Sequence, residues 1–229
     1  HNPELFGFDY DSPMILGNGE FAFSADVTGL QTFYEDYRDN LPLCTMSQWG
    51  WHTTPVSQER YSYTRDDLQL TMYDTYGRQV GYAKKKMPGN EQVYDWLRQN
   101  PHRLNLGRVG FGIKKRDGSP VKKEDITNIY QELDLYDGVL YSRFKVEGVP
   151  CAVRTCVHPT RDMIAVEVHS ELITTHQMQI EITFPYGSPD KTASDWDNKD
   201  AHSTDVVFSD DGIVQMKRTL DQDEYYVTI

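Results

Sequence analysis

Alternation of apolar and polar residues dominates this chain, and it predicts β-strands far more often than helices. Period-two segments cover residues 139–147, 151–158, 163–169 and 178–184. Because successive side chains of a strand point to opposite faces, each segment carries one apolar and one polar face. Short turns at 147–150 and 158–162 separate the first three segments. The pattern predicts a meander of antiparallel strands.

The same pattern recurs at both ends of the chain. Gly17, Asn18 and Gly19 predict a tight turn, since glycine and asparagine tolerate positive φ, and a buried strand face follows it at alternate positions from Phe21 to Val27. An Asp-Gly turn at 209–212 separates two further strands, and residues 225–229 again have strand-like sequence. An ending of this kind is expected of a piece of a longer polypeptide.

One segment breaks the β pattern. Asn90 is placed to cap a short helix over residues 91–99, which Asn100 and Pro101 would end. No Gly/Ser-rich linker or internal repeat divides the chain, so we expect a single domain over residues 1–229. Many strands, short turns and little helix predict an all-β fold: a large antiparallel β-sandwich with one or two short helices.

Composition narrows the possible partners. The chain has 229 residues and a formal net charge of -12, so it would repel both nucleic acid and an anionic membrane surface. No run approaches the roughly 18 apolar residues of a membrane-spanning helix, and the first residues lack the features of a signal peptide. We therefore expect neither nucleic acid nor a membrane as a partner.

Motifs for metal, cofactor and covalent chemistry are missing from the sequence. The histidines are scattered and no Cys/His ligand spacing occurs, so neither a metal site nor a cofactor is expected. The GNGEFAF segment lacks the lysine of a phosphate loop, and there is no GxSxG nucleophile motif. With 35 Asp and Glu residues, no carboxylate pair stands out as catalytic.

The aromatic segment SQWGWH contains the first candidate binding residues: Trp49, Trp51 and His52. Indole rings offer an apolar face to the C–H surface of a sugar, and an imidazole can hydrogen-bond its hydroxyls. The alternative is a tryptophan pair buried in a core or an interface. His102 and Arg103, which follow the predicted helix, are secondary candidates, with an ordinary turn after the helix as the alternative.

Six ordered blocks of sequence carry a resemblance to a known family. They are SPMILGNGEFAFSADVTGLQTF, SQWGWH, LRQNPHRLNLGRVGF, RFKVEGVPCAVRTCVHP, ITFPYGSP and SDWDNKDAHST. Together they resemble the N-terminal region of bacterial six-hairpin glycosidase-like proteins, which are similar to the maltose phosphorylase and fucosidase groups. The resemblance implies a β-supersandwich of the galactose-mutarotase type that precedes an (α/α)6 barrel holding the catalytic carboxylates.

From this resemblance we expect a non-catalytic domain of a glycoside hydrolase that acts on oligo- or polysaccharides. Its partners would be carbohydrate and a helical barrel beyond residue 229 of the same polypeptide, and its location periplasmic or secreted. No residue of this chain is expected to be catalytic. Two alternatives remain: a free-standing carbohydrate-binding module, and a mutarotase-like sugar epimerase that would use His102 or His158 with a carboxylate.

Overall fold

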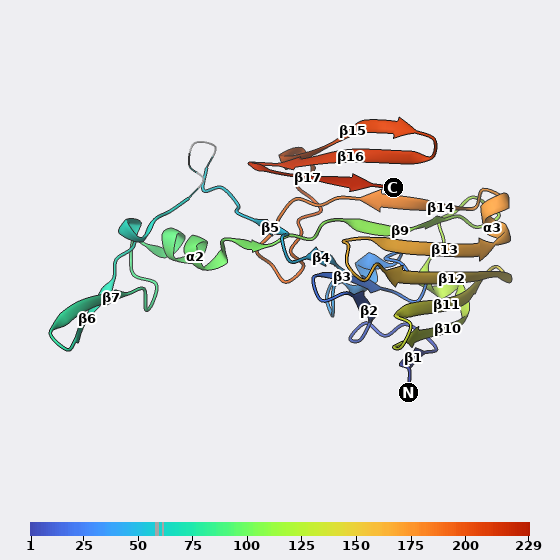
Figure 1. The fold of residues 1–229 in the computed structure, drawn as a ribbon, viewed down its shortest axis with the longest axis horizontal. Coiled ribbons are helices and arrows are strands. Elements are labelled where there is room, and N and C mark those ends of the chain that lie inside the picture. Colours follow the sequence, from blue (N-terminus) through green and yellow to red (C-terminus); the bar gives the residue numbers. More distant parts are fainter. Residues whose placement is uncertain (58–59, 61) are drawn as a thin grey trace. The chain divides into compact units, whose positions relative to one another are not determined.

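The computed structural model describes residues 1–57, 60 and 62–229, and it is built mainly of antiparallel β-strands (Figure 1). Strands account for 45% and helices for 12% of the structure, which confirms the all-β prediction. The chain divides into two compact units that are interleaved along the sequence. The first consists of His1–Gly50 and Asn105–Pro185, and the second of Trp51–Leu104 and Tyr186–Ile229. The prediction of one domain stays a prediction.

The first unit contains three sheets. A five-stranded sheet has the order β1-β10-β11-β12-β13, a three-stranded sheet the order β2-β3-β4, and β14 pairs with β9. The bounds are β1 Glu4–Leu5, β2 Met14–Gly17, β3 Phe21–Ala25, β4 Thr45–Ser47, β9 Arg108–Ile113, β10 Ile126–Asp134, β11 Val139–Val146, β12 Val149–Val157, β13 Ile164–Ser170 and β14 Met178–Thr183, with helices α1 Tyr34–Tyr37 and α3 Glu171–Thr174 and a 3-10 turn at Lys123–Asp125.

The predicted meander is confirmed for its first three strands. β11, β12 and β13 are consecutive antiparallel neighbours, and the β11–β12 hairpin turns at Glu147 and Gly148, with φ of 47° and 85°. Two residues with positive φ are typical of the turn that fits the twist of a hairpin. The fourth segment differs from the prediction. β14 pairs with β9, because α3 takes the chain away from the edge of β13.

The core of the first unit lies between the inner faces of two sheets. β2 packs against β11 and β12, and β3 packs against β12. The apolar residues of these strands that are buried are Met14, Leu16, Phe21, Phe23, Ala25, Leu140, Phe144, Val146, Cys151 and Val153. This two-layer packing is the arrangement expected of a β-sandwich.

A buried loop after β3 runs against the five-stranded sheet. Gly29 has φ of 86°, and a Cβ there would lie 3.0 Å from Ser142 Oγ and 3.1 Å from Val153 Cγ1. Its carbonyl accepts a hydrogen bond of 2.8 Å from Thr155 Oγ1. The position therefore requires glycine both for its backbone conformation and for the close approach to β11 and β12.

The second unit contains one larger sheet and two separate strand pairs. β15, β16 and β17 form a three-stranded sheet, β6 pairs with β7, and β5 pairs with β8. The bounds are β5 Trp51–His52, β6 Thr71–Thr75, β7 Arg78–Tyr82, β8 His102–Arg103, β15 His202–Asp210, β16 Ile213–Leu220, β17 Asp223–Thr228 and helix α2 Glu91–Gln99, with 3-10 turns at Arg65–Asp67 and Lys199–Ala201. In the described ranges of the chain, no helix is long and apolar enough to cross a membrane.

Helix α2 has the predicted bounds, but its N-terminal cap differs from the prediction. The Asn90 side chain makes no cap hydrogen bond; its Oδ1 instead accepts a hydrogen bond of 2.7 Å from Met87 N, in the turn before the helix. At the other end, the Asn100 amide donates to Trp96 O at 3.0 Å, and Asn100 Oδ1 accepts from Thr54 N at 2.9 Å. These bonds tie the end of α2 to the segment that follows β5.

Candidate functional site

The short ladder of β5 and β8 brings together four of the five residues that the sequence selects. Trp51 is paired with Arg103, and His52 with His102. Consecutive residues of a strand point to opposite sides, so one side of the ladder carries Trp51 and Arg103 and the other carries the two histidines. The predicted cluster is therefore present in space, although its members face two different environments.

The outer side of this ladder is an aromatic and cationic surface. The Trp51 side chain is 45% exposed, and the Arg103 guanidinium carbon lies 4.2 Å from the centre of its ring. A guanidinium over an indole is held by the ring's quadrupole, and this attraction is strongest for tryptophan among the aromatic residues. The indole is therefore fixed in orientation while part of its surface stays accessible to solvent.

The inner side of the ladder is anchored by His52. This residue is 1% exposed, and its Nδ1 lies 2.8 Å from Asp223 Oδ2. Because a carboxylate can only accept, the proton of this hydrogen bond is on Nδ1. His52 Nε2 lies 3.2 Å from Asp221 Oδ2, at an angle outside that of a hydrogen bond. Both carboxylates thus turn toward one buried imidazole.

His102 packs edge-on against His52, with ring centroids 5.4 Å apart. Its Nδ1 donates to Arg103 O at 2.9 Å, so its Nε2 accepts from Thr54 Oγ1 at 3.1 Å in the neutral ring. Burial lowers the pKa of His102, and the neighbouring His52 acts in the same direction against the hydrogen bond to Arg103 O. Both ring nitrogens are thereby occupied by protein groups.

Tyr186 and Gly187 complete the inner side. The Tyr186 hydroxyl donates to Asp221 Oδ2 at 2.6 Å, and its ring meets the His52 ring edge-on at 5.3 Å. Burial, followed by the bond to Asp221, raises the pKa of Tyr186. A Cβ on Gly187 would lie 2.4 Å from His52 Cδ2, so only glycine leaves room for the imidazole here.

Four of these inner residues were missed by the sequence analysis: Tyr186, Gly187, Asp221 and Asp223. The two aspartates are separated by one residue at the β16–β17 hairpin, with Asp221 in the turn at φ of 51° and Asp223 at the start of β17. Aspartate is one of the residues that adopt positive φ readily, so the sequence explains it fully as a turn residue. Only the fold places it beside His52.

Trp49 lies in the first unit and is held by a different carboxylate. Its side chain is 51% exposed, and its Nε1 donates to Asp162 Oδ2 at 2.6 Å. The Ser47 hydroxyl donates to the same oxygen at 2.6 Å. This second indole is therefore also fixed in orientation and partly exposed, at a place defined by β4 and the turn before β13.

Comparison with family models and with curated proteins finds no match for this chain.

Proposed function

We propose that this chain is a non-catalytic, carbohydrate-binding β-sandwich domain of a glycoside hydrolase. The observation that carries the proposal is the half-exposed Trp51 indole with the Arg103 guanidinium over its ring. A sugar ring can pack its C–H face on an accessible indole surface. N–H groups of a guanidinium are suited to donate to the hydroxyl and ring oxygens of a sugar.

Rigid presentation of the aromatic residue supports this function. The β5–β8 ladder is fixed from behind by the bond from His52 to Asp223 and by the packing of Gly187 on the imidazole. A binding surface whose side chains are already ordered loses less conformational entropy when a ligand binds. We assign His52 and His102 the role of positioning Trp51 and Arg103, because their own rings are buried.

The contacts of Asp221 and Asp223 support the non-catalytic part of the proposal. Glycoside hydrolysis needs one carboxyl group to protonate the leaving oxygen and a second to activate water or attack. Asp221 and Asp223 both turn to His52, and Asp221 also accepts from Tyr186. Their contacts serve the internal structure of the site, and the reaction is left to the helical barrel that the family resemblance implies.

The mutarotase-like alternative has less support. General acid–base catalysis needs a nitrogen or oxygen within hydrogen-bond reach of the substrate. Both nitrogens of His102 are engaged by Thr54 and Arg103. Polarimetry on freshly dissolved glucose or galactose tests this alternative directly, and we expect no acceleration of mutarotation.

Titration of the chain with a panel of neutral oligosaccharides, followed by tryptophan fluorescence and calorimetry, tests the proposal. Trp51→Ala should weaken binding by about 1 to 2 kcal/mol, which is roughly five- to thirtyfold in Kd. Tyr136→Ala is the matched control, because Tyr136 is 97% exposed at a hairpin turn and has no part in the site. Equal affinity of the Trp51→Ala variant and the unsubstituted chain would disprove the role of the ladder.

Turnover is a separate measurement. We expect no hydrolysis of aryl glycosides by this chain. Activity that disappears when Asp221 or Asp223 is changed to Asn would show that the catalytic groups lie here, and the non-catalytic assignment would then be wrong.

A further inference from the structure

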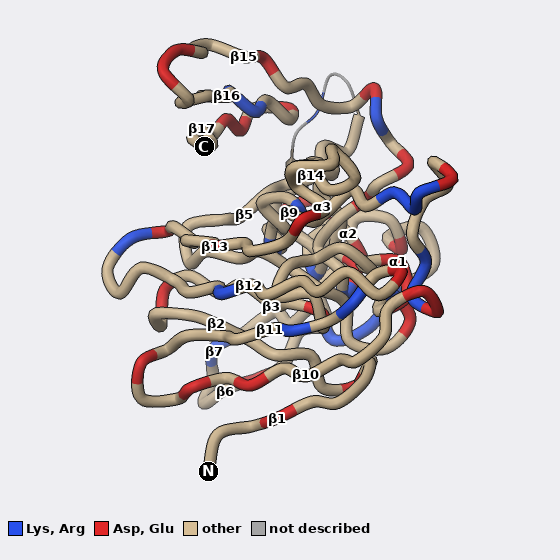
Figure 2. The backbone as a smooth tube through the Cα atoms, turned by 90° about the vertical axis from the view of Figure 1, so that its right-hand side faces the viewer, with Lys and Arg blue, Asp and Glu red and all other residues tan. Residues whose placement is uncertain are grey.

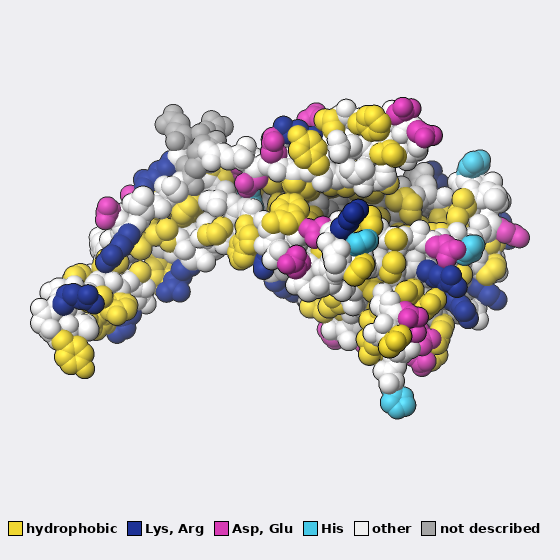
Figure 3. Space-filling view, in the orientation of Figure 1, with side chains coloured by type: hydrophobic (Ala, Val, Ile, Leu, Met, Phe, Trp, Pro, Cys, Tyr) yellow, Lys and Arg dark blue, Asp and Glu magenta, His cyan; other side chains and the backbone are white. Residues whose placement is uncertain are grey.

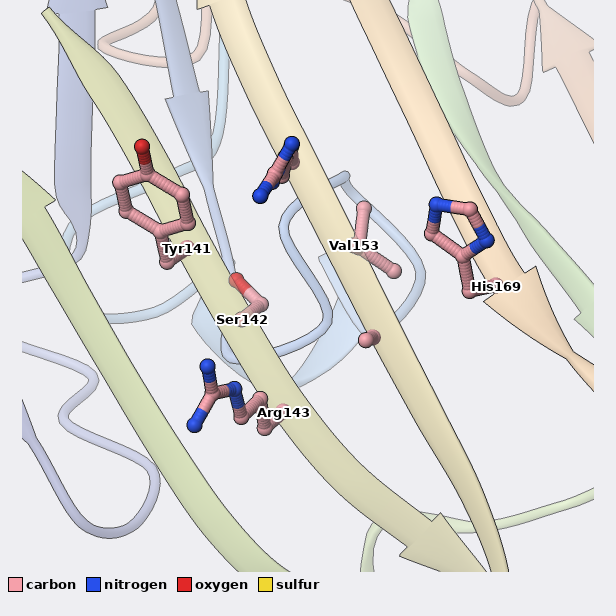
Figure 4. A pocket seen from close by; sticks show the side chains of 7 residues that line it. Tyr141, Ser142, Arg143, Val153 and His169 are labelled. Atoms are coloured by element: carbon pink, nitrogen blue, oxygen red, sulfur yellow. The ribbon is translucent and has the colours of Figure 1, made fainter.

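The outer face of the five-stranded sheet carries a groove that the proposed function does not use. One hollow of about 190 Å³ lies over β11, β12 and β13, and a second of about 570 Å³ continues toward the β11–β12 turn. Both are lined by Arg143, Ala152 and His169, so they form one groove, called here the outer-face groove. Figure 4 shows Tyr141 and Arg143 on one side of it and His169 on the other.

The register of the sheet explains why the groove exists. Ala152 stands between Arg143 on β11 and His169 on β13 in the ladder. One row toward the turn, Pro150 is paired with Lys145. A short side chain flanked by long ones leaves a depression on a sheet face, because side chains stand roughly perpendicular to the sheet. The floor of the groove is therefore apolar, and its walls are long and polar.

The walls are cationic in a chain whose net charge is -12. Arg143, Lys145 and Arg154 line the groove. Figure 2 shows Lys and Arg on β11 and β12, whereas the neighbouring strands β1 and β10 carry Asp and Glu. In Figure 3 basic side chains lie over these strands together with an acidic and a histidine side chain.

The carboxylates near the groove compensate this charge only in part. Glu132 on β10 attracts Arg143 electrostatically, without forming an ion pair with it. Glu167 pairs with Arg154 at 3.2 Å and with His169 at 2.9 Å, so one carboxylate serves two partners. Glu171 lies at the far end, at the start of α3. The ion pairs found among the described residues include none to Arg143 or Lys145. These two side chains are two positions apart on β11 and share one face.

We propose that the outer-face groove binds an acidic saccharide, with a sugar carboxylate held by Arg143 and Lys145 and the C–H face of the ring on Ala152 and Pro150. The guanidinium forms paired hydrogen bonds with a carboxylate, and Lys145 adds a point charge. The inference rests on the proposed function only in taking carbohydrate as the partner. The groove and the Trp51 site are different surfaces, and the groove takes an acidic saccharide whereas the Trp51 site takes a neutral one.

Isothermal titration with a uronate trisaccharide and with its neutral carboxyl-reduced counterpart tests this proposal. We expect the acidic trisaccharide to bind at least tenfold more tightly, and this preference to shrink as salt is raised. Arg143→Gln and Lys145→Gln should each weaken binding of the acidic ligand at least fivefold. Lys85→Gln is the charge-matched control, since Lys85 is exposed in the other unit and should leave the affinity unchanged.

Ala152→Leu is a second variant that leaves the charge as it is. The added side chain would fill the floor of the groove on the outward face of β12, where it does not enter the core, and it should abolish binding of the acidic ligand. Circular dichroism and thermal unfolding of each variant establish that it is folded. Equal affinity for the acidic and the neutral trisaccharide, or an Arg143→Gln variant that matches Lys85→Gln, would overturn the proposal.

The two sites can fail independently. Loss of neutral-ligand binding in Trp51→Ala, together with unchanged acidic-ligand binding in Arg143→Gln, would retain the proposed function and remove the outer-face groove. The reverse result would retain the groove and remove the role of Trp51. A sulfated trisaccharide in a third arm separates a general anion site, which would bind it equally well, from the carboxylate site that we propose.

Discussion

The buried carboxyl group of Asp26 makes the stability of the first unit depend on pH in an unusual direction. Asp26 follows β3 and is 1% exposed. Its Oδ1 accepts from Thr28 N at 2.8 Å and from Thr28 Oγ1 at 2.6 Å, and its Oδ2 accepts from Phe33 N at 2.6 Å. Burial outweighs these hydrogen bonds and raises the pKa of Asp26 from 3.8 to about 6.

The direction of this pH dependence follows from the linkage between proton binding and folding. Because the folded-state pKa is raised, the native chain binds more protons at this group than the unfolded chain between about pH 4 and pH 6. The contribution to stability is fully present below the unfolded pKa of 3.8 and is lost as the pH rises through about 6. The difference between the two pKa values corresponds to about 3 kcal/mol of unfolding free energy.

Asp26→Asn removes this titration and keeps the shape of the side chain. The asparagine has one acceptor oxygen, so it can keep the contacts to Thr28 but presents an amide N–H₂ group to Phe33 N. The lost bond and the buried donor should cost about 1 to 3 kcal/mol. At low pH the substitution is therefore destabilising, and at neutral pH the removal of a buried charge offsets much of that cost.

Urea unfolding of both proteins from pH 3.5 to pH 7.5 measures the effect. The stability difference, unsubstituted chain minus variant, should decrease by about 3 kcal/mol across this range. Asp117→Asn is a control of opposite sign, since hydrogen bonds from Ser119 lower the pKa of the exposed Asp117 carboxyl. The contribution of Asp117 to stability is therefore lost as the pH falls. A stability difference for Asp26→Asn that stays constant over the whole pH range would refute the reasoning.

Three further predictions concern the candidate binding residues. Gly187→Ala should destabilise the chain by about 1 to 3 kcal/mol in urea unfolding, because its Cβ would lie 2.4 Å from the buried His52 ring; unchanged stability would contradict that packing. Burial lowers the pKa of His102, so its contribution to stability should be lost as the pH falls below the unfolded value of 6.5, and NMR titration should place its protonation below that value. Asp162→Ala removes the acceptor of Trp49 Nε1 and should increase quenching of tryptophan fluorescence by acrylamide, whereas equal quenching would show that this bond does not order the indole.

Local patterns in the sequence were sufficient for elements whose stability is decided locally. The β11–β12 hairpin could be predicted because alternation defines its strands and the Glu147-Gly148 pair fits a turn with two positive φ values. Helix α2 could be predicted because an Asn-Pro stop ends a single amphipathic segment, although Asn90 accepts from Met87 N in the preceding turn and makes no cap hydrogen bond. In both cases the determining residues lie within a single short stretch of the chain.

Strand pairing over a long distance could not be predicted in this way. The segment of β14 alternates as regularly as that of β13, yet it pairs with β9, whose residues lie more than 60 positions earlier. Alternation defines which face of a strand is apolar but does not select its neighbour. One local feature marks the point where the chain leaves the edge of β13. The Ser170 side chain accepts a hydrogen bond from Leu172 N and caps α3 at the end of this strand.

The candidate binding residues show the same limit. Residue type selected Trp51, His52, His102 and Arg103 as candidates, since aromatic, imidazole and guanidinium groups are suited to contacts with a sugar. Strand geometry alone already requires that Trp51 and His52, as neighbours in a strand, point to opposite sides, so both cannot face one ligand. Alternation does not decide which of the two is exposed; the structure shows that it is Trp51. The aspartates beside His52 remain beyond such reasoning, because they lie about 170 residues away and the sequence explains them as ordinary residues of a hairpin.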